Sequence, residues 1–172
     1  TTQNFCLAPV GVHNDIEIVI APINAARPGF DAAYQIVYRN KGNQLVSGTI
    51  YFSYEEDVLD FVSSSQTLAS QSSGNLSWNY SNLMPFESRS FIVTLNVNSP
   101  TEIPAVNIGD LLDFSAVITS ITPDEFTGDN SFVLNQTVVG SYDPNDKVCL
   151  EGTIVPVSKI GDYLHYTINF EN

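Results

Sequence analysis

Apolar and polar side chains alternate along three separate stretches of this chain, and this period of two limits its fold more than any other feature. The alternate positions of these stretches carry apolar side chains, namely Tyr34, Ile36, Tyr38, Phe91, Val93, Leu95, Phe114, Ala116 and Ile118. Successive side chains of a strand point to opposite faces, so each stretch predicts a strand with one buried face. No segment of helical length carries an apolar stripe with the period of a helix. The sequence therefore predicts an all-β domain whose inner face includes these residues.

The spacing of the strands narrows the fold class. Further strands are predicted within residues 5–20, 48–54, 76–80 and 132–139. Residues 63–77 are rich in Ser, Gln and Asn, and we expect a loop or a weak edge strand there. About seven short strands separated by turn residues favour an immunoglobulin-like antiparallel β-sandwich. We expect this domain to span residues 1–139.

Composition excludes several classes of partner. Nineteen acidic residues against six basic ones give a formal charge of −13, which repels nucleic acid and anionic membranes. No run of about 18 apolar residues is present, so we expect no membrane insertion. Hydrophobic residues make up 43% of the chain, which is enough to bury a core.

Cys6 and Cys149 are the chain's two cysteines. They are too few for a disulfide framework and are not spaced as a metal site. A disulfide requires Cα atoms within about 7 Å. We expect the two residues to lie at opposite ends of the sandwich, which favours two separate thiols over a bridge.

A repeat links the two ends of the chain. Residues 29–40 match residues 161–172 at an offset of 132 (161 minus 29), with Gly, Tyr, Ile, an aromatic residue and Asn in register. Residues 11–15 resemble residues 140–146 with a small change in length. A repeat of one domain length indicates a tandem array. Residues 148–172 are therefore predicted to form the first two strands of a second, incomplete β-domain. Their exposed apolar face favours self-association with a neighbouring molecule or folding back on the sheet of the first domain.

Three motifs carry a resemblance to a known family, namely residues 27–30 (RPGF), 140–147 (GSYDPNDK) and 166–172 (YTINFEN). They resemble the repeated immunoglobulin-like domains of large secreted and surface proteins of Bacteroidota, many of them exported by the type IX secretion system. The resemblance implies an extracellular, cell-surface location and neighbouring domains of the same polypeptide as partners. It identifies no ligand.

Residues 140–147 are predicted to be the joint between the two domains. Asp143, Asn145 and Asp146 resemble the D-x-N-D core of cadherin linkers, and calcium prefers oxygen ligands of this kind. Three side chains do not complete a calcium shell, and we expect residues 55–57 and 102–110 at the same pole to supply the remainder. The alternative is a turn in which these side chains bond nearby backbone amides.

The acidic loop 124–130 is expected at the opposite pole, beside Asn14 and Asp15. It is either half of a joint with a preceding domain or a solvated hairpin tip.

Trp78 and Tyr80 lie two residues apart, so they share one face of a strand. They could stack on a surface glycan, which would make the domain a carbohydrate-binding module accompanying a secreted enzyme. A single Trp in a sandwich is otherwise a core anchor. The two histidines, His13 and His165, fall in different units, and no catalytic grouping is evident. The sequence therefore favours a non-catalytic structural or adhesive module, with a glycan or protein as its ligand.

Overall fold

The computed structural model describes residues 10–140, 146–149, 161 and 163–169. The chain divides into two compact units, residues 1–140 and 141–172, and each is described by itself.

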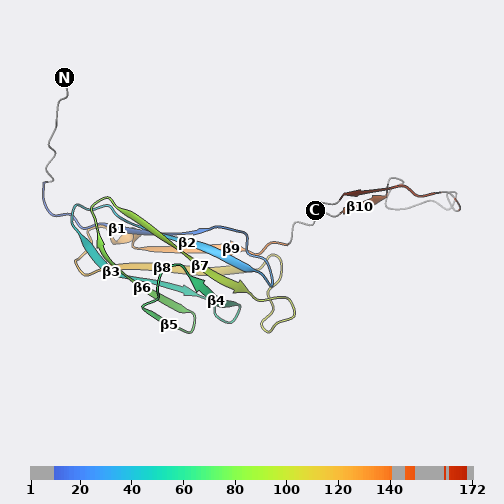
Figure 1. Cartoon of the computed structure of the whole chain (residues 1–172), viewed down its shortest axis with the longest axis horizontal. Helices are drawn as coiled ribbons and strands as arrows, with labels where there is room; N and C mark the ends of the chain where they lie inside the picture. The colour runs from blue at the N-terminus through green and yellow to red at the C-terminus, as the bar shows by residue number, and fades with distance from the viewer. Residues whose placement is uncertain (1–9, 141–145, 150–160, 162, 170–172) are drawn as a thin grey trace, which may run out of the picture. The chain divides into compact units, whose positions relative to one another are not determined.

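Strands make up nearly all the regular structure of the first unit (Figure 1). Its strands are β1 (Ile16–Pro22), β2 (Asp31–Asn40), β3 (Val46–Tyr54), β4 (Leu59–Ser64), β5 (Ser70–Ser72), β6 (Asn75–Leu83), β7 (Ser88–Val97), β8 (Leu111–Ser120) and β9 (Ser131–Thr137). A single turn of 3-10 helix, η1 (Thr127–Asp129), lies between β8 and β9.

The strands form two antiparallel sheets. One has the order β1-β2-β7-β4 and the other the order β5-β6-β3-β8-β9. Every pair of neighbouring strands in both sheets is antiparallel. The predicted all-β, antiparallel sandwich is therefore confirmed.

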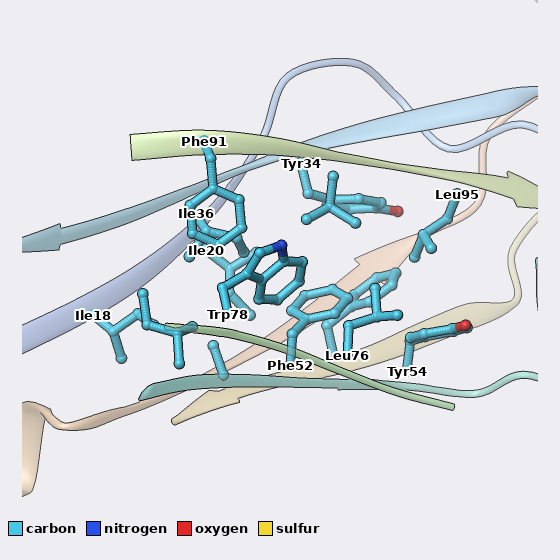
Figure 2. Close-up of a cluster of buried hydrophobic side chains, with 14 of the residues drawn as sticks. Ile18, Ile20, Tyr34, Ile36, Phe52, Tyr54, Leu76, Trp78, Phe91 and Leu95 are labelled. Atoms are coloured by element: carbon cyan, nitrogen blue, oxygen red, sulfur yellow. The ribbon is translucent and has the colours of Figure 1, made fainter. Parts of the chain in front are cut away.

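The core lies between the two sheets and contains all nine residues predicted for the inner face. Pairing across β2 and β7 places Tyr34 opposite Val93, and both side chains are fully buried. Aromatic rings from the two sheets meet in this layer, as Figure 2 shows. The rings of Trp78 and Phe91 have centroids 4.6 Å apart, and those of Tyr34 and Phe114 are 4.5 Å apart.

Of the edge strands, β4 was not predicted and β5 was predicted as one of two alternatives. β4 begins at Leu59, ahead of the region expected to be loop, and pairs with β7. Its register shifts between Phe61 and Ser63, which interrupts the alternation that would mark a strand in the sequence. β5 has three residues, all exposed, and it is the weak edge strand that the sequence left as one alternative.

The direction of the strands gives the sandwich two ends. The N-terminal pole holds the start of β1 and the β2–β3, β6–β7 and β8–β9 connections. The C-terminal pole holds the end of β9 and the β1–β2, β3–β4 and β7–β8 connections. The first strand of the sandwich thus starts at one pole and its last strand ends at the other (Figure 1).

The second unit contains a two-stranded antiparallel pairing. β10 (Asp146–Cys149) pairs with β11 (Tyr166–Asn169). The sequence pattern predicts strands within residues 147–157 and 163–170, which overlap these two. Tyr163 and Ile168 are 91% and 61% exposed in this unit. Self-association through these apolar side chains stays a prediction. The pairing state of the two cysteines also stays a prediction, because Cys6 lies outside the described residues.

Candidate functional site at the N-terminal pole

Residues 10–15, the leading segment, are held at the N-terminal pole from two sides. One side is the β2–β3 turn, residues 41–44, and the other is the β8–β9 loop, residues 124–130. We call these three segments together the N-terminal clasp. The predicted proximity of the 124–130 loop to Asn14 and Asp15 is borne out, since the Glu125 amide donates to the Asn14 carbonyl over 2.9 Å.

The β2–β3 turn grips the backbone of the leading segment. The amides of Lys41 and Gly42 donate to the Asp15 carbonyl over 2.6 and 3.1 Å, and the Asn43 amide donates to the His13 carbonyl over 2.9 Å. A Cβ at Gly42 would lie 2.3 Å from that His13 oxygen. The approach of the two backbones therefore requires glycine at position 42.

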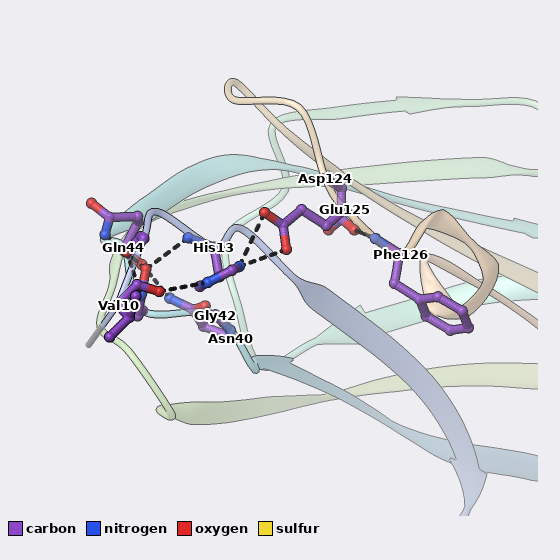
Figure 3. Close-up of polar contacts among 10 residues, drawn as sticks. Val10, His13, Asn40, Gly42, Gln44, Asp124, Glu125 and Phe126 are labelled. Atoms are coloured by element: carbon purple, nitrogen blue, oxygen red, sulfur yellow. Dashed lines mark hydrogen bonds and ion pairs between the residues drawn. The ribbon is translucent and has the colours of Figure 1, made fainter.

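Asn43 closes the turn over the leading segment with its side chain. Its Oδ1 accepts from the His13 amide over 2.8 Å, and its Nδ2 donates to the Gly11 carbonyl over 3.0 Å. Gly11 has φ of +89°, a left-handed conformation that suits glycine. The buried Asn40 also stabilises this turn, because its Oδ1 accepts a hydrogen bond from the Gly42 amide over 3.0 Å (Figure 3).

Asp124 fixes the β8–β9 loop against the start of β1. One carboxylate oxygen accepts from the Ile16 amide over 2.8 Å, and the other accepts from the Phe126 amide over 2.7 Å. A single side chain thus satisfies one amide on each of the two segments, at a point where Ile16 itself is fully buried.

The His13 ring links the start of the leading segment to the β8–β9 loop. Nδ1 lies 2.9 and 3.2 Å from the two carboxylate oxygens of Glu125, and Nε2 lies 2.9 Å from the Val10 carbonyl oxygen (Figure 3). The hydrogen bond to Glu125, followed by that to Val10, raises the pKa of His13 above its ordinary value. About half of the side chain is exposed, so solvent weakens the pairing.

Lys41 supplies the cation at the centre of the clasp's acidic residues. Its Nζ lies 2.5 Å from Asp129, 3.5 Å from Asp15 and 3.7 Å from Glu17, and 5.6 Å from the centroid of the Phe126 ring. The bond to Asp129 raises the pKa of Lys41, whereas burial is the main cause that raises the pKa of Asp15. Within the described residues, no group of three or more His, Cys, Asp or Glu side chains is arranged to hold a metal.

The C-terminal pole contains an open hollow of about 550 Å³. Glu55, Glu56 and Asp57 line it, together with Pro104 of the β7–β8 connection, and none of its lining residues is basic. Asn98 holds this connection, because its Nδ2 donates to the Asp57 and Pro104 carbonyls over 2.9 Å each. Residues 55–57 and 104 thus lie together at the pole where β9 ends, as the sequence predicted.

The predicted calcium ligands fall largely outside the described residues. Asp143 and Asn145 lie outside them, and of Asp146 the structure describes the backbone alone, at the start of β10. Calcium at the joint stays a prediction.

Trp78 and Tyr80 do not form the surface platform that stacking on a glycan requires. Trp78 is 0% and Tyr80 is 4% exposed. The Trp78 Nε1 donates to the Ser64 hydroxyl over 3.0 Å, and the Tyr80 hydroxyl donates to the Thr119 carbonyl over 2.9 Å. Neither ring presents a face to a glycan, because both strand positions face the opposite sheet. Trp78 is a core anchor, as expected of a single Trp in a sandwich.

Among the comparisons with known proteins, the likeness to one solved structure shows the fold. The model of a family described as a domain of unknown function (DUF7619) matches residues 143–172. No curated protein matches the chain in sequence. The CARDB domain of the PF1109 protein from Pyrococcus furiosus, solved in complex with di-metal ions, is 14% identical with a TM-score of 0.55, covering 77% of this chain and 100% of that one.

Two further solved structures are less similar. A cohesin module of a family 33 glycoside hydrolase from Clostridium perfringens is 10% identical with a TM-score of 0.46, covering 76% of this chain and 100% of that one. A Nocardia farcinica protein described as having an immunoglobulin-like fold is 6% identical with a TM-score of 0.43, covering 71% and 97%. The likeness to the CARDB domain, together with the two antiparallel sheets, shows the fold of the first unit, an immunoglobulin-like β-sandwich of the CARDB type. In the described part of the chain, no helix has the length and hydropathy to cross a bilayer.

Proposed function

We propose that this chain is a non-catalytic spacer and adhesive module of a long, modular bacterial surface or secreted protein. The observation that carries the proposal is that the first strand of the sandwich starts at one pole and its last strand ends at the other. A domain built in this way extends the polypeptide by its own length. The motifs at residues 27–30, 140–147 and 166–172 support placing the parent protein among type IX secretion substrates of Bacteroidota, at the cell surface.

The pairing of the terminal strands suits a module under tension. β1 pairs with β2 through seven residue pairs, and β9 pairs with β8 through seven. A force applied to the ends of the sandwich runs along both strands, perpendicular to their antiparallel hydrogen bonds. These bonds must then break together in shear instead of one after another.

The clasp adds a second mechanical property. An incoming chain held at residues 11–16 by Gly42, Asn43 and Asp124 leaves the pole in a fixed direction. A preceding domain joined through it cannot swing as it would on a flexible linker. We propose that the joint at residues 140–147 gains similar stiffness from calcium bound by Asp143, Asn145 and Asp146.

Single-molecule force spectroscopy tests the proposed function. The sandwich is pulled through its two ends in one arm, and through cysteines placed at Gln44 and Met84 in the other. Gln44 and Met84 flank the paired strands β3 and β6 at the N-terminal pole, so the second arm unzips their ladder. We expect end-to-end pulling to require the higher force. Equal or lower force for end-to-end pulling would contradict a role as a spacer under tension.

A further inference from the structure

We propose that His13 is a pH-dependent latch on the first residues of the leading segment. As an imidazolium it ties Val10 to the β8–β9 loop, and its deprotonation frees Val10. The inference deepens the proposed spacer function, on which it rests, by naming the group that regulates the direction of the incoming chain.

The partners of the ring require the protonated form. Both ring nitrogens face acceptors, since Nδ1 lies 2.9 Å from a Glu125 carboxylate oxygen and Nε2 lies 2.9 Å from the Val10 carbonyl oxygen. A neutral imidazole has one N–H and one lone pair. Either neutral tautomer would place its lone pair against one of these acceptors at contact distance. Only the imidazolium donates to both.

The charged groups around the ring favour the same state. Glu125 is the carboxylate in contact with the ring. Asp124 of the same loop accepts hydrogen bonds from the amides of Ile16 and Phe126. On the other side, the β2–β3 turn presents the neutral amide of Asn43 to the His13 backbone. Of the other charged groups at this pole, Asp15, Glu17 and Asp129 pair with Lys41. At the β6–β7 connection, Glu87 pairs with Arg89.

Loss of the proton would act on a defined part of the segment. The left-handed conformation of Gly11 turns the chain so that the Val10 carbonyl reaches the ring. The bonds that Gly42 and Asn43 make to Gly11, His13 and Asp15 involve backbone and amide groups, which do not titrate. Deprotonation therefore loosens Val10 and the peptide group that joins it to Gly11, and it leaves the Gly11 carbonyl and residues 12–15 in place, so the chain would pivot at Gly11.

The direction of the pH dependence follows from the raised pKa of His13. The folded form holds the proton more tightly than the unfolded form. The latch is therefore fully closed below the ordinary pKa of about 6.5, and it opens as pH rises through the higher value of the folded state. We expect a stiffer joint in an acidic medium than in an alkaline one.

Imidazole NMR on the whole chain tests the latch, because the chain has two histidines and His13→Gln assigns the resonances. We expect His13 to titrate above about 6.5 and Glu125→Gln to lower its pKa. Glu102→Gln makes the same chemical change at the C-terminal pole, where the carboxylate accepts from the Ser99 amide, and it should leave the His13 titration unchanged.

Backbone relaxation of ¹⁵N-labelled protein reports the release itself. Order parameters of the Val10 and Gly11 amides should fall along the His13 titration curve, and in Glu125→Gln they should fall at lower pH. A His13 pKa at or below the ordinary value would overturn the latch. Order parameters that do not change as His13 titrates would overturn it too. Either result leaves the force measurement unaffected, whereas low resistance to end-to-end pulling would defeat the spacer function whatever His13 does.

Discussion

The two poles of the sandwich differ in how the charge of their acidic side chains is balanced. At the N-terminal pole, Asp15, Glu17 and Asp129 surround the ammonium of Lys41, and Glu125 contacts the ring of His13. At the C-terminal pole, the hollow formed by residues 53–58, 73–75 and 104 has three acids and no basic residue. The N-terminal pole thus carries its own cations, whereas the hollow depends on ions from solution for charge balance.

This difference shows how one sandwich can have two kinds of joint. The N-terminal clasp is built from hydrogen bonds and ion pairs internal to the chain. The C-terminal pole leads to the joint for which we propose calcium. We therefore expect the first pole to respond to substitutions in its own clasp and to pH, and the second to respond to divalent cations.

The largest expected loss of stability comes from a substitution in the core, between the two poles. It gives a scale for the smaller losses expected at either pole. Trp78→Ala removes a fully buried ring that contacts Phe91 of the opposite sheet. We expect a loss of about 3–5 kcal/mol in the free energy of unfolding, because the cavity cannot collapse completely. Chemical denaturation measures it. A loss near zero would mean that the ring does not anchor the core.

The calcium prediction sharpens the contrast at the C-terminal pole. A protein that carries the complete following domain should unfold at a higher temperature in calcium than in chelator. Binding to the folded state alone contributes about 2.7 kcal/mol at a hundredfold excess over Kd. Asp143→Ala combined with Asp146→Ala should abolish the difference, while Asp31→Ala on β2 should retain it. If calcium does not change the unfolding temperature of the wild-type protein, the joint is the hydrogen-bonded turn and the calcium prediction is wrong.

Gly42→Ala should break the clasp at the N-terminal pole. The added methyl group would sit 2.3 Å from the His13 carbonyl oxygen and 2.8 Å from the Asp15 amide nitrogen. We expect a loss of about 1–3 kcal/mol from overpacking, measured by thermal unfolding. Gly128→Ala at the same pole meets the flexible Phe126 ring at 3.4 Å and should cost at most about 0.5 kcal/mol. Equal costs for the two variants would show that the leading segment is not tightly held.

Lys41→Met should have the smallest effect of this series. It leaves the acids of the N-terminal pole without their central cation, but these side chains are a quarter to a third exposed. We expect a loss of about 1 kcal/mol at low salt, which should shrink near 1 M salt as screening increases. Arg39→Met, an exposed charge removal on β2, should change stability less. A salt-independent loss would indicate that Lys41 acts through packing alone.

The strands that could be predicted from the sequence are those in which apolar and polar residues alternate. Tyr34, Phe91 and Phe114 stand in alternating stretches, and burial of one face makes such a stretch a strand wherever it occurs. β4 has a weaker pattern, since its pairing with β7 contains an irregularity at Phe61 and Ser63. Its existence depends on a neighbour that the local sequence does not reveal.

The clasp was predicted only in outline. The position of the 124–130 loop follows from the order of the strands, which the alternation fixes. The bonds of His13 join residues 30 and 112 positions away in the sequence. Neither Asn43 nor Glu125 has a local pattern that distinguishes it from an ordinary turn residue. The close approach of Gly42 to His13 appears only when the two backbones are placed together.

Backbone order at the N-terminal pole tests the central claim most directly, namely that this pole is held closed by its own residues. ¹⁵N relaxation at about pH 6 should give the amides of residues 11–15 order parameters near those of β2, about 0.85. In Gly42→Ala the same amides should become mobile while β2 stays rigid. Wild-type values below about 0.6 in residues 11–15 would contradict the account, because a leading segment that moves freely cannot set the direction of a neighbouring domain.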